Sequence, residues 1–198
     1  MCQFFETIKC EDGKLFNLKW HNFRFNRARK EHFGNSNKID LSEIITIPES
    51  CKKGLFRCRV IYSKTIDKIE FIQYQYRKIE SLKLIEDNEI DYRFKFLDRE
   101  KLNKLFEKRG NFDDIIIVKN GIISDSSIAN CIFYDGQKWW TPDSPLLPGT
   151  QRAKLISEAK IKTCKVTPAT ISKYKKVGLI NAMWDLENMP IIEIDKIQ

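Results

Sequence analysis

The chain has 198 residues, of which 42% are hydrophobic and 12% aromatic, enough to bury one large core or two small ones. Its longest apolar stretches, such as 115–118, are far shorter than the roughly 20 residues of a membrane-spanning helix, so we expect no membrane segment. The net charge is +8, but basic residues are spread along the whole chain and alternate with acids. This pattern favours a solvated surface over a nucleic-acid-binding stripe. The positive charge instead predicts an anionic small molecule as substrate or cofactor.

The N-terminal segment 1–7 lacks the basic region and apolar core of a secretory signal, so a cytoplasmic chain is expected. The cysteines form no C-x2-C pair and have no set of histidines nearby, so no metal site is expected. In a cytoplasmic chain they are expected to be buried, reduced thiols. The cysteines are Cys2, Cys10, Cys51, Cys58, Cys131 and Cys164.

The first half of the chain has the pattern of an α+β structure. Asp12-Gly13 is typical of a hairpin turn, so strands 4–10 and 14–18 are predicted to pair. Apolar residues recur at helical spacing from Trp20 to Phe33, and Gly34 follows where a helix would end. A short helix at 41–47 and paired strands at 55–63 and 66–76 complete this half.

The second half is predicted to be rich in antiparallel strands. Asp98 and Gly110 bracket a helix over 98–109. The turns Asn120-Gly121 and Asp135-Gly136 then separate the strands of a meander, at 114–119, 122–124, 128–134 and 138–141. Helices at 151–159 and 168–176, the latter with Pro168 in its first position, precede closing strands at 179–183 and 191–194.

Four separated segments carry chemically informative residues. The first is Phe5-Glu6-Thr7-Ile8-Lys9, followed by the H-x-x-R pair His21 and Arg24. In the second, Lys95 lies 30 residues ahead of Asp125. The third runs from Asp113 to Phe133, with an N-G turn, Asp125 and an S-x-x-N element that ends at Asn130. The fourth contains Thr141-Pro142 and an L-x-G-x-x-R element at 147–152.

In their order and spacing, these segments resemble those of the class IV aminotransferases and 4-amino-4-deoxychorismate lyases, which are fold-type IV enzymes dependent on pyridoxal 5'-phosphate (PLP). The resemblance spans nearly the whole chain. It implies an α+β fold with a small N-terminal α/β domain, residues 1–88, and a C-terminal antiparallel-β-rich domain with helices, residues 89–198, that carries the PLP lysine. Family members are usually homodimers, so a homodimer is implied too.

The resemblance also implies a role for each matching residue. Lys95 would carry the cofactor and move protons, Arg24 would bind the cofactor phosphate through its guanidinium fork, and Asp125 would pair with the protonated ring nitrogen. Asp125 stands where the family usually has glutamate, and Gln151 where it commonly has threonine. The further cofactor-binding positions are Asn130 and the phosphate cradle Gly149, Thr150 and Gln151 at a helix N-terminus. Asn181, Ala182 and Met183 would face the substrate.

A shared site does not fix the reaction, so three functions stay open at this point. The first is a lyase resembling 4-amino-4-deoxychorismate lyase, which would release pyruvate and leave 4-aminobenzoate for folate biosynthesis. The second is a class IV transaminase of the branched-chain or D-amino acid type. The third is a non-catalytic descendant of the fold that binds a small anion, an alternative that Asp125 and Gln151 keep open.

Overall fold

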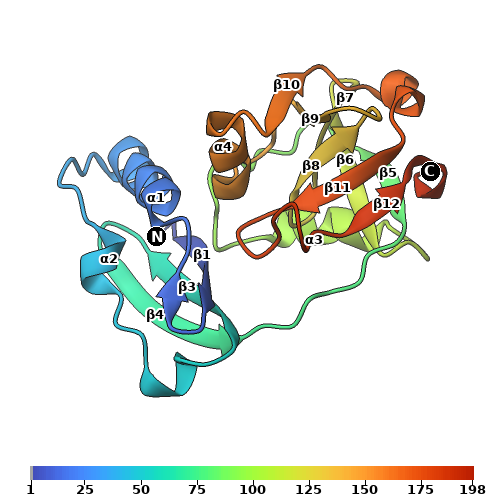
Figure 1. The fold of residues 1–198 in the computed structure, drawn as a ribbon. Coiled ribbons are helices and arrows are strands. Elements are labelled where there is room, and N and C mark those ends of the chain that lie inside the picture. Colours follow the sequence, from blue (N-terminus) through green and yellow to red (C-terminus); the bar gives the residue numbers. More distant parts are fainter. Residues whose placement is uncertain (1) are drawn as a thin grey trace. The chain divides into compact units, whose positions relative to one another are not determined.

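The computed structural model describes residues 2–198, which form two compact units. The first unit comprises the chain up to Tyr76 together with Phe94–Asp98, and the second comprises Arg77–Arg93 and Arg99–Gln198. In the described part of the chain, no helix is long and apolar enough to cross a membrane. Each unit is described separately below (Figure 1).

The first unit is built on an antiparallel sheet with the strand order β2-β1-β3-β4. Asp12 and Gly13 adopt the positive φ angles of 47° and 73° that the predicted hairpin turn requires. The strands are β1 (Phe4–Glu11), β2 (Lys14–Leu15), β3 (Leu55–Tyr62) and β4 (Ile66–Gln73). All four agree with the predicted strands, although β2 has only two residues because the following helix begins at Leu18.

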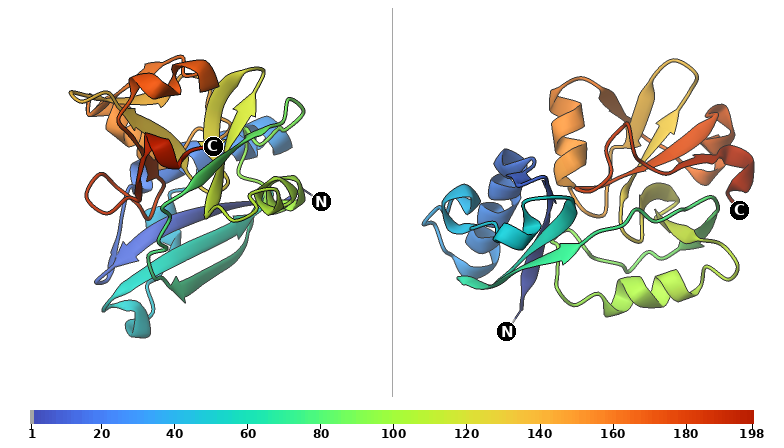
Figure 2. Two further views of the ribbon diagram at one scale, coloured as in Figure 1. Left: turned by 90° about the vertical axis from the view of Figure 1, so that its right-hand side faces the viewer. Right: turned by 60° about the horizontal axis from the view of Figure 1, so that its bottom comes forward.

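Helices cover one face of this sheet (Figures 1 and 2). The main helix, α1 (Leu18–Phe33), ends at Gly34 with a left-handed φ of 65°, as the sequence predicts. The shorter elements are α2 (Leu41–Ile44) and the 3-10 turn η1 (Glu49–Cys51). The buried core between helices and sheet contains Phe4, Ile8, Phe25, Val60 and Tyr62.

Alternation of side chains along β1 and β3 gives the sheet a second, chemically different face. The cross-strand pairs Thr7 with Arg59 and Lys9 with Arg57 point away from the face that carries Phe4 and Ile8. We call this second face, with Phe5, Thr7 and Lys9 on β1 and Arg57 and Arg59 on β3, the outer face. In the described residues, no helix of the first unit covers it.

The segment Phe94–Asp98 joins the first unit because it is bonded to the start of β1. The N–H of Phe5 donates to the Lys95 carbonyl at 3.0 Å, and the N–H of Leu97 donates to the Gln3 carbonyl at 2.9 Å. The rings of Phe94 and Phe96 contact the ring of Phe4. The compact units therefore divide differently from the predicted domains 1–88 and 89–198. The chain leaves the first unit after Tyr76 and returns to it for the segment that contains Lys95.

The second unit contains the predicted antiparallel meander, here β6 to β9, extended by parallel pairs at both ends. β5 pairs with β6 in parallel, β9 pairs with β10 in parallel, and β11 lies antiparallel to both β8 and β12. The strands are β5 (Leu82–Glu86), β6 (Asp114–Lys119), β7 (Ile122–Ser126), β8 (Asn130–Tyr134), β9 (Trp139–Pro142), β10 (Ile161–Cys164), β11 (Lys176–Ile180) and β12 (Ile191–Glu193).

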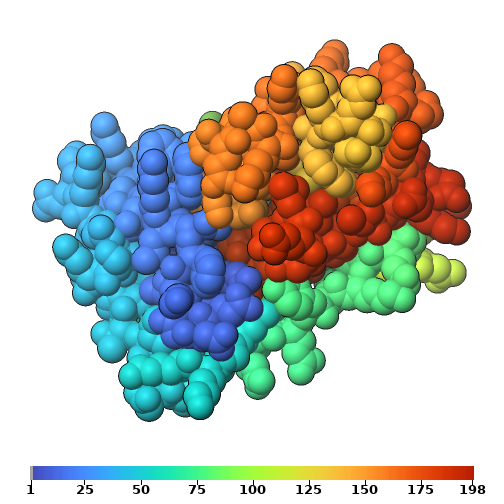
Figure 3. Space-filling model, in the orientation of Figure 1, coloured from blue at the N-terminus to red at the C-terminus, as the bar shows by residue number. Residues whose placement is uncertain are grey.

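The helices of the second unit are shorter than the sequence predicts. The elements are α3 (Glu100–Glu107), α4 (Thr150–Ser157), and the 3-10 turns η2 (Pro168–Lys173) and η3 (Ile194–Lys196). The residue before α3 is Arg99 rather than the predicted Asp98. In place of the predicted helix 168–176, residues 168–173 form a 3-10 turn that Thr167 and Thr170 cap reciprocally, and Lys176 already belongs to β11. The end of α4 lies exposed at the surface (Figure 3).

The cysteines are all free thiols in the described residues, as predicted. Four of them are buried, whereas Cys2 is exposed and Cys164 is partly exposed, so the prediction of burial is wrong for these two. Cys2 precedes the first strand, where little of the chain covers it.

Candidate functional site

Lys95 lies in the first unit on the outer face of the sheet. Its ammonium group is 4.6 Å from the centre of the Phe5 ring, and its carbonyl accepts the N–H of the same residue. Phe94 and Phe96 turn to the opposite side, where they pack with the core. Lys95 and its neighbours Phe94 and Phe96 therefore lie on opposite sides of this segment, which contributes one isolated bridge to the sheet, between Phe96 and Phe4.

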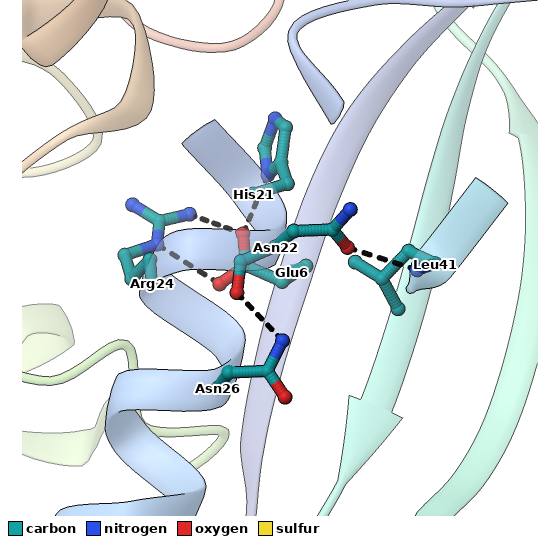
Figure 4. Close-up of polar contacts among 6 residues, drawn as sticks. All are labelled: Glu6, His21, Asn22, Arg24, Asn26 and Leu41. Carbon is teal, nitrogen blue, oxygen red and sulfur yellow. Dashed lines mark hydrogen bonds and ion pairs between the residues drawn. The ribbon is translucent and has the colours of Figure 1, made fainter. Parts of the chain in front are cut away.

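A buried cluster of three charged or polar side chains connects β1 to α1 (Figure 4). Glu6 has no exposed surface and lies on the helix-facing side of β1. Arg24 donates from Nε to one carboxylate oxygen of Glu6 at 2.9 Å and from Nη2 to the other at 2.6 Å. His21 Nδ1 lies 2.6 Å from the second oxygen. Because His21 and Arg24 are three residues apart, one helix face presents both to the same carboxylate.

The charges in this cluster follow from burial and pairing. Burial would raise the pKa of Glu6, but the Arg24 guanidinium and the His21 hydrogen bond outweigh it and lower that pKa to about 2. Burial lowers the pKa of His21, and the charges of Arg24 and Lys95 act in the same direction. His21 is therefore neutral, and to donate to Glu6 it carries its proton on Nδ1. The Nε edge of Arg24 is committed to Glu6, so a phosphate would have to use the other edge.

In the second unit, Asp125 on β7 is held by two neutral donors. Asn130 Nδ2 donates to one carboxylate oxygen at 2.8 Å, and the N–H of Leu147 donates to the other at 2.8 Å. Asn130 also donates to the Leu147 carbonyl at 2.9 Å, which ties the strand to the loop that precedes α4. Burial raises the pKa of Asp125 to about 6, against the opposing effect of these donors and of Arg152. The site therefore favours a cationic or proton-donating partner for Asp125.

The N-terminus of α4 packs closely against β8. Gly149 is the cap residue and provides no side chain to the first turn, and Thr150 and Gln151 are both buried. A Cβ atom at Gly149 would lie 1.9 Å from Oδ1 of Asn130, so only glycine fits between this turn and β8. Helix N-termini attract anions because N–H groups and the helix dipole point the same way.

Arg152 was not among the predicted cofactor-binding residues, but it fixes the position of this turn. Its guanidinium donates from Nε to the Thr141 hydroxyl at 3.1 Å and from Nη2 to the Pro142 carbonyl at 2.8 Å. Thr141 in turn donates to the Cys131 carbonyl at 3.0 Å. The T-P and L-x-G-x-x-R elements are thus parts of one hydrogen-bonded unit that joins α4 to β8 and β9.

The predicted substrate-facing residues form a turn after β11. The Asn181 side chain accepts from the N–H groups of Met183 and Trp184 at 2.9 and 3.1 Å and donates to the Ile128 carbonyl at 3.3 Å. Met183 is buried and Ala182 is half-buried. Within this turn, Asn181 shapes the backbone, so any contact with a substrate would come in addition to that role.

Sequence reasoning missed Glu6 as a functional residue. A signal for it exists, because β1 has apolar residues at positions 4 and 8 on the face toward α1, and an acid between them needs a cationic partner. His21 and Arg24 on the following helix are the available partners. The described residues contain no group of His, Cys, Asp or Glu able to hold a metal ion.

Replacing Glu6 with glutamine leaves the Arg24 charge buried without its counterion. We expect the free energy of unfolding at pH 7 to fall by roughly 3–5 kcal/mol, the usual result of removing one partner of a buried pair. Ionised Glu6 stabilises the folded state fully above its unfolded pKa of 4.5, and this contribution is lost as the pH falls through the folded pKa of about 2. The difference between variant and wild type should therefore shrink at pH 3, which urea unfolding at both pH values measures.

The matched control is Glu31→Gln, whose carboxylate lies 3.6 Å from Arg27 on the exposed side of α1. This change should alter the unfolding free energy by less than about 1 kcal/mol at either pH. An unfolding free energy of Glu6→Gln equal to that of the wild type at pH 7 would contradict the structural role of the cluster.

Comparison with known proteins identifies the family. The amino-transferase class IV family matches residues 3–194. A Haemophilus influenzae protein described as uncharacterized is 38% identical over 185 residues, which cover 92% of this chain and 98% of that protein. The aminodeoxychorismate lyase of Bacillus subtilis is 24% identical over 229 residues, covering 98% of this chain and 78% of the lyase.

Solved structures show the same fold. A protein from Haemophilus somnus 129PT, provisionally assigned as a 4-amino-4-deoxychorismate lyase, is 34% identical and superposes with a TM-score of 0.87 over 92% of this chain and 97% of its own. A hypothetical aminotransferase from Mycobacterium tuberculosis in a PLP-bound form is 16% identical, with a TM-score of 0.77 over 96% and 80% of the two chains. Because the family match covers almost the whole chain, this protein belongs to the class IV aminotransferases and is a PLP-dependent enzyme of fold type IV.

Proposed function

We propose that this enzyme is a lyase that converts 4-amino-4-deoxychorismate into 4-aminobenzoate and pyruvate, a reaction that would serve folate biosynthesis. The observation that carries the proposal is the likeness to the Haemophilus somnus protein, which extends over nearly the full length of both chains and bears a lyase assignment. The Bacillus subtilis relative carries the same activity in its name. The transaminase alternative shares the cofactor and the fold, so only the reaction separates the two.

The residues of the second unit fit the proposed cofactor. Asp125 accepts one hydrogen bond on each oxygen and keeps lone pairs for the protonated nitrogen of a pyridine ring. The burial that raises its pKa to about 6 makes such a cationic partner favourable. Gly149 leaves no room for a Cβ atom, and Thr150 and Gln151 begin a helix whose N-terminus suits a phosphate. Asn130 would hold Asp125 in place.

In the first unit, Lys95 would carry the cofactor through its ammonium nitrogen, and Arg24 would bind the phosphate. When bound, PLP supplies an electron sink that makes the proton beside the substrate amine removable. Lys95 Nζ, displaced by the substrate amine, would take that proton. The C–O bond to the enolpyruvyl group would then break as the ring becomes aromatic. The enolpyruvate that leaves would take up a proton at its methylene carbon and become pyruvate.

Neighbouring residues would support Lys95 in two ways. The ring of Phe5 would hold the Lys95 side chain in place, because the centre of the ring is 4.6 Å from Lys95 Nζ. The carboxylate of Glu6 neutralises the charge of Arg24, and His21 stays neutral. Together these three side chains add no net charge near Lys95. Asn181, Ala182 and Met183 would face the substrate from the turn after β11.

The carrier role of Lys95 is tested by absorption spectroscopy. Wild-type protein incubated with PLP should show the absorption band of lysine-bound PLP, and Lys95→Ala should lack it because no amine remains to bond the aldehyde. Lys19→Ala is the matched control, since Lys19 also lies over an aromatic ring of the first unit, that of Trp20, at 5.4 Å. It should keep the band, and a band of full intensity in Lys95→Ala would exclude Lys95 as carrier.

The phosphate cradle is tested with Gly149→Ala. The φ angle of Gly149 is −69°, which alanine adopts readily, so the contact with Asn130 is the sole obstacle. We expect PLP affinity to fall at least about tenfold, a loss of ~1.4 kcal/mol, as measured by absorbance titration. Gly178→Ala serves for comparison, because its nearest contact is the flexible end of Met189 at 2.7 Å. Unchanged affinity in Gly149→Ala would argue against a cofactor at this turn.

The lyase reaction is tested by following pyruvate release from 4-amino-4-deoxychorismate. The wild type should release pyruvate and 4-aminobenzoate in equal amounts, and Lys95→Ala should release neither. Amino transfer to 2-oxo acids, assayed in parallel, distinguishes the alternative. Transfer without pyruvate release would establish a transaminase, and a wild-type protein that neither binds PLP nor performs either reaction would leave the anion-binding descendant.

A further inference from the structure

Arg99 is the residue at which the chain enters the second unit after the segment that contains Lys95. The boundary between the two compact units lies between Asp98 and Arg99, and three residues separate Arg99 from Lys95. Four residues of fully extended chain span at most about 14 Å. A fixed Arg99 therefore limits the region that Lys95 can reach, so the contacts of Arg99 bear on the position of the proposed cofactor lysine.

The side chain of Arg99 is hydrogen-bonded to the loop between β7 and β8. Its Nη2 donates to the Ser127 carbonyl at 2.6 Å, and its guanidinium carbon lies 6.0 Å from the centre of the Tyr92 ring. Ser127 and Tyr92 are both buried. A hydrogen bond from a charged donor is roughly twice as strong as one between neutral groups. Arg99 thus anchors the start of α3 on this loop.

The same loop carries the residue that holds Asp125. The loop is closed by Ser126, whose N–H donates to the Ala129 carbonyl at 2.8 Å and whose hydroxyl accepts the Ala129 N–H at 3.0 Å. Asn130 follows directly and donates to the Asp125 carboxylate at 2.8 Å. One hydrogen-bonded loop is therefore attached to Arg99 on one side and to Asp125 on the other.

The stability of α3 does not account for an arginine at this position. Arg99 is the N-cap residue of α3, and its side chain makes no capping hydrogen bond. A cation there lies at the positive end of the helix dipole, which disfavours the helix. Aspartate, asparagine, serine and threonine are the residues that helices prefer at their N-cap. The hydrogen bond to Ser127 gives the arginine a role that the helix does not.

We propose that Arg99 is a positioning residue that holds Lys95 within reach of the cofactor by anchoring the lysine segment to the loop that orients Asp125. This inference rests on the proposed function, because it takes Lys95 as the cofactor carrier and Asp125 as the partner of the ring nitrogen. Arg99 itself contacts neither cofactor nor substrate in this role. Without the anchor, Asp125 keeps its own donors, Asn130 and Leu147, whereas the lysine segment loses its fixed end.

The test compares two forms of the cofactor. PLP bonds to a lysine through its aldehyde, whereas pyridoxamine 5'-phosphate has an amine in that place and binds without such a bond. Dissociation constants for both are measured by titration calorimetry with the wild type, Arg99→Gln and Arg99→Lys. Arg99→Gln removes the charged donor to the buried Ser127 carbonyl, so PLP should bind at least about tenfold more weakly. Pyridoxamine 5'-phosphate should stay within about threefold of the wild type.

Arg99→Lys keeps a cationic donor and should restore part of the PLP affinity, because an ammonium can still reach a carbonyl but lacks the planar guanidinium. Lys95→Ala gives the ratio of the two dissociation constants that is expected when no lysine bond forms. The ratio for Arg99→Gln should lie between the ratios of the wild type and Lys95→Ala.

Arg109→Gln is the matched control at the other end of α3. The Arg109 guanidinium makes the same two kinds of contact, since it donates to the Phe106 carbonyl at 3.2 Å and lies 4.0 Å from the centre of the Phe106 ring. Arg109 has no hydrogen bond to the loop between β7 and β8. Both dissociation constants of Arg109→Gln should therefore stay within about twofold of the wild type.

Thermal unfolding without cofactor shows which variants are folded. A folded Arg99→Gln with wild-type dissociation constants would overturn the proposal. An equal loss of affinity for both ligands would also overturn it, because such a loss indicates support of the fold and not of the lysine. If Arg99→Gln does not fold, Arg99→Lys decides: a loss confined to PLP supports the proposal, and an equal effect on both ligands overturns it.

The outcomes for this inference and for the proposed function are separate. A wild type whose PLP affinity depends on Arg99 but that releases no pyruvate from 4-amino-4-deoxychorismate would support the positioning role and overturn the lyase. A wild type that releases pyruvate while Arg99→Gln binds PLP normally would support the lyase and overturn the positioning role.

Discussion

The alternation of side chains along β1 is the constraint on which the chemistry of the first unit depends. Because successive residues point to opposite faces, Glu6 is directed into the interface with α1 while Phe5 meets Lys95 on the outer face. A shift of register by one residue would exchange these positions and bury Phe5 against the helix. The backbone hydrogen bond from Phe5 to Lys95 also ties β1 to the segment of the proposed cofactor lysine. The same strand therefore positions Glu6 on the helix side of the sheet and Lys95 on the outer face.

Two of the buried carboxylates, Glu6 and Asp125, have pKa values that are shifted in opposite directions because their neighbours differ. Glu6 faces a guanidinium and a histidine, and its pKa is lowered to about 2. Asp125 accepts hydrogen bonds from the amides of Asn130 and Leu147, and burial raises its pKa to about 6 against the effect of these donors and of the Arg152 charge. Environments that shift the pKa values of two acids in opposite directions give the two acids different roles. Glu6 is a permanent charge that holds α1 on the sheet, whereas Asp125 is poised to share a proton, which is what a partner for a pyridinium nitrogen needs.

Much of the fold could be predicted from the sequence because its signals are local. The Asp12-Gly13 turn, the end of α1 at Gly34 and the strands around Asn120-Gly121 all depend on residues a few positions apart. The return of Phe94–Asp98 to the first unit could not be predicted this way. It depends on the packing of Phe94 and Phe96 against Phe4, some 90 residues earlier in the chain, which no local pattern reveals.

The candidate site shows the same division between local and distant causes. Family-like motifs pointed to Lys95, Asp125 and Gly149, but not to the partners of these residues. That Arg24 binds Glu6, and that Arg57 has no acid, depends on cross-strand and helix-to-strand neighbours. An unpaired arginine on a sheet face opposes stability, since its charge repels Lys9 and its buried donor is unsatisfied.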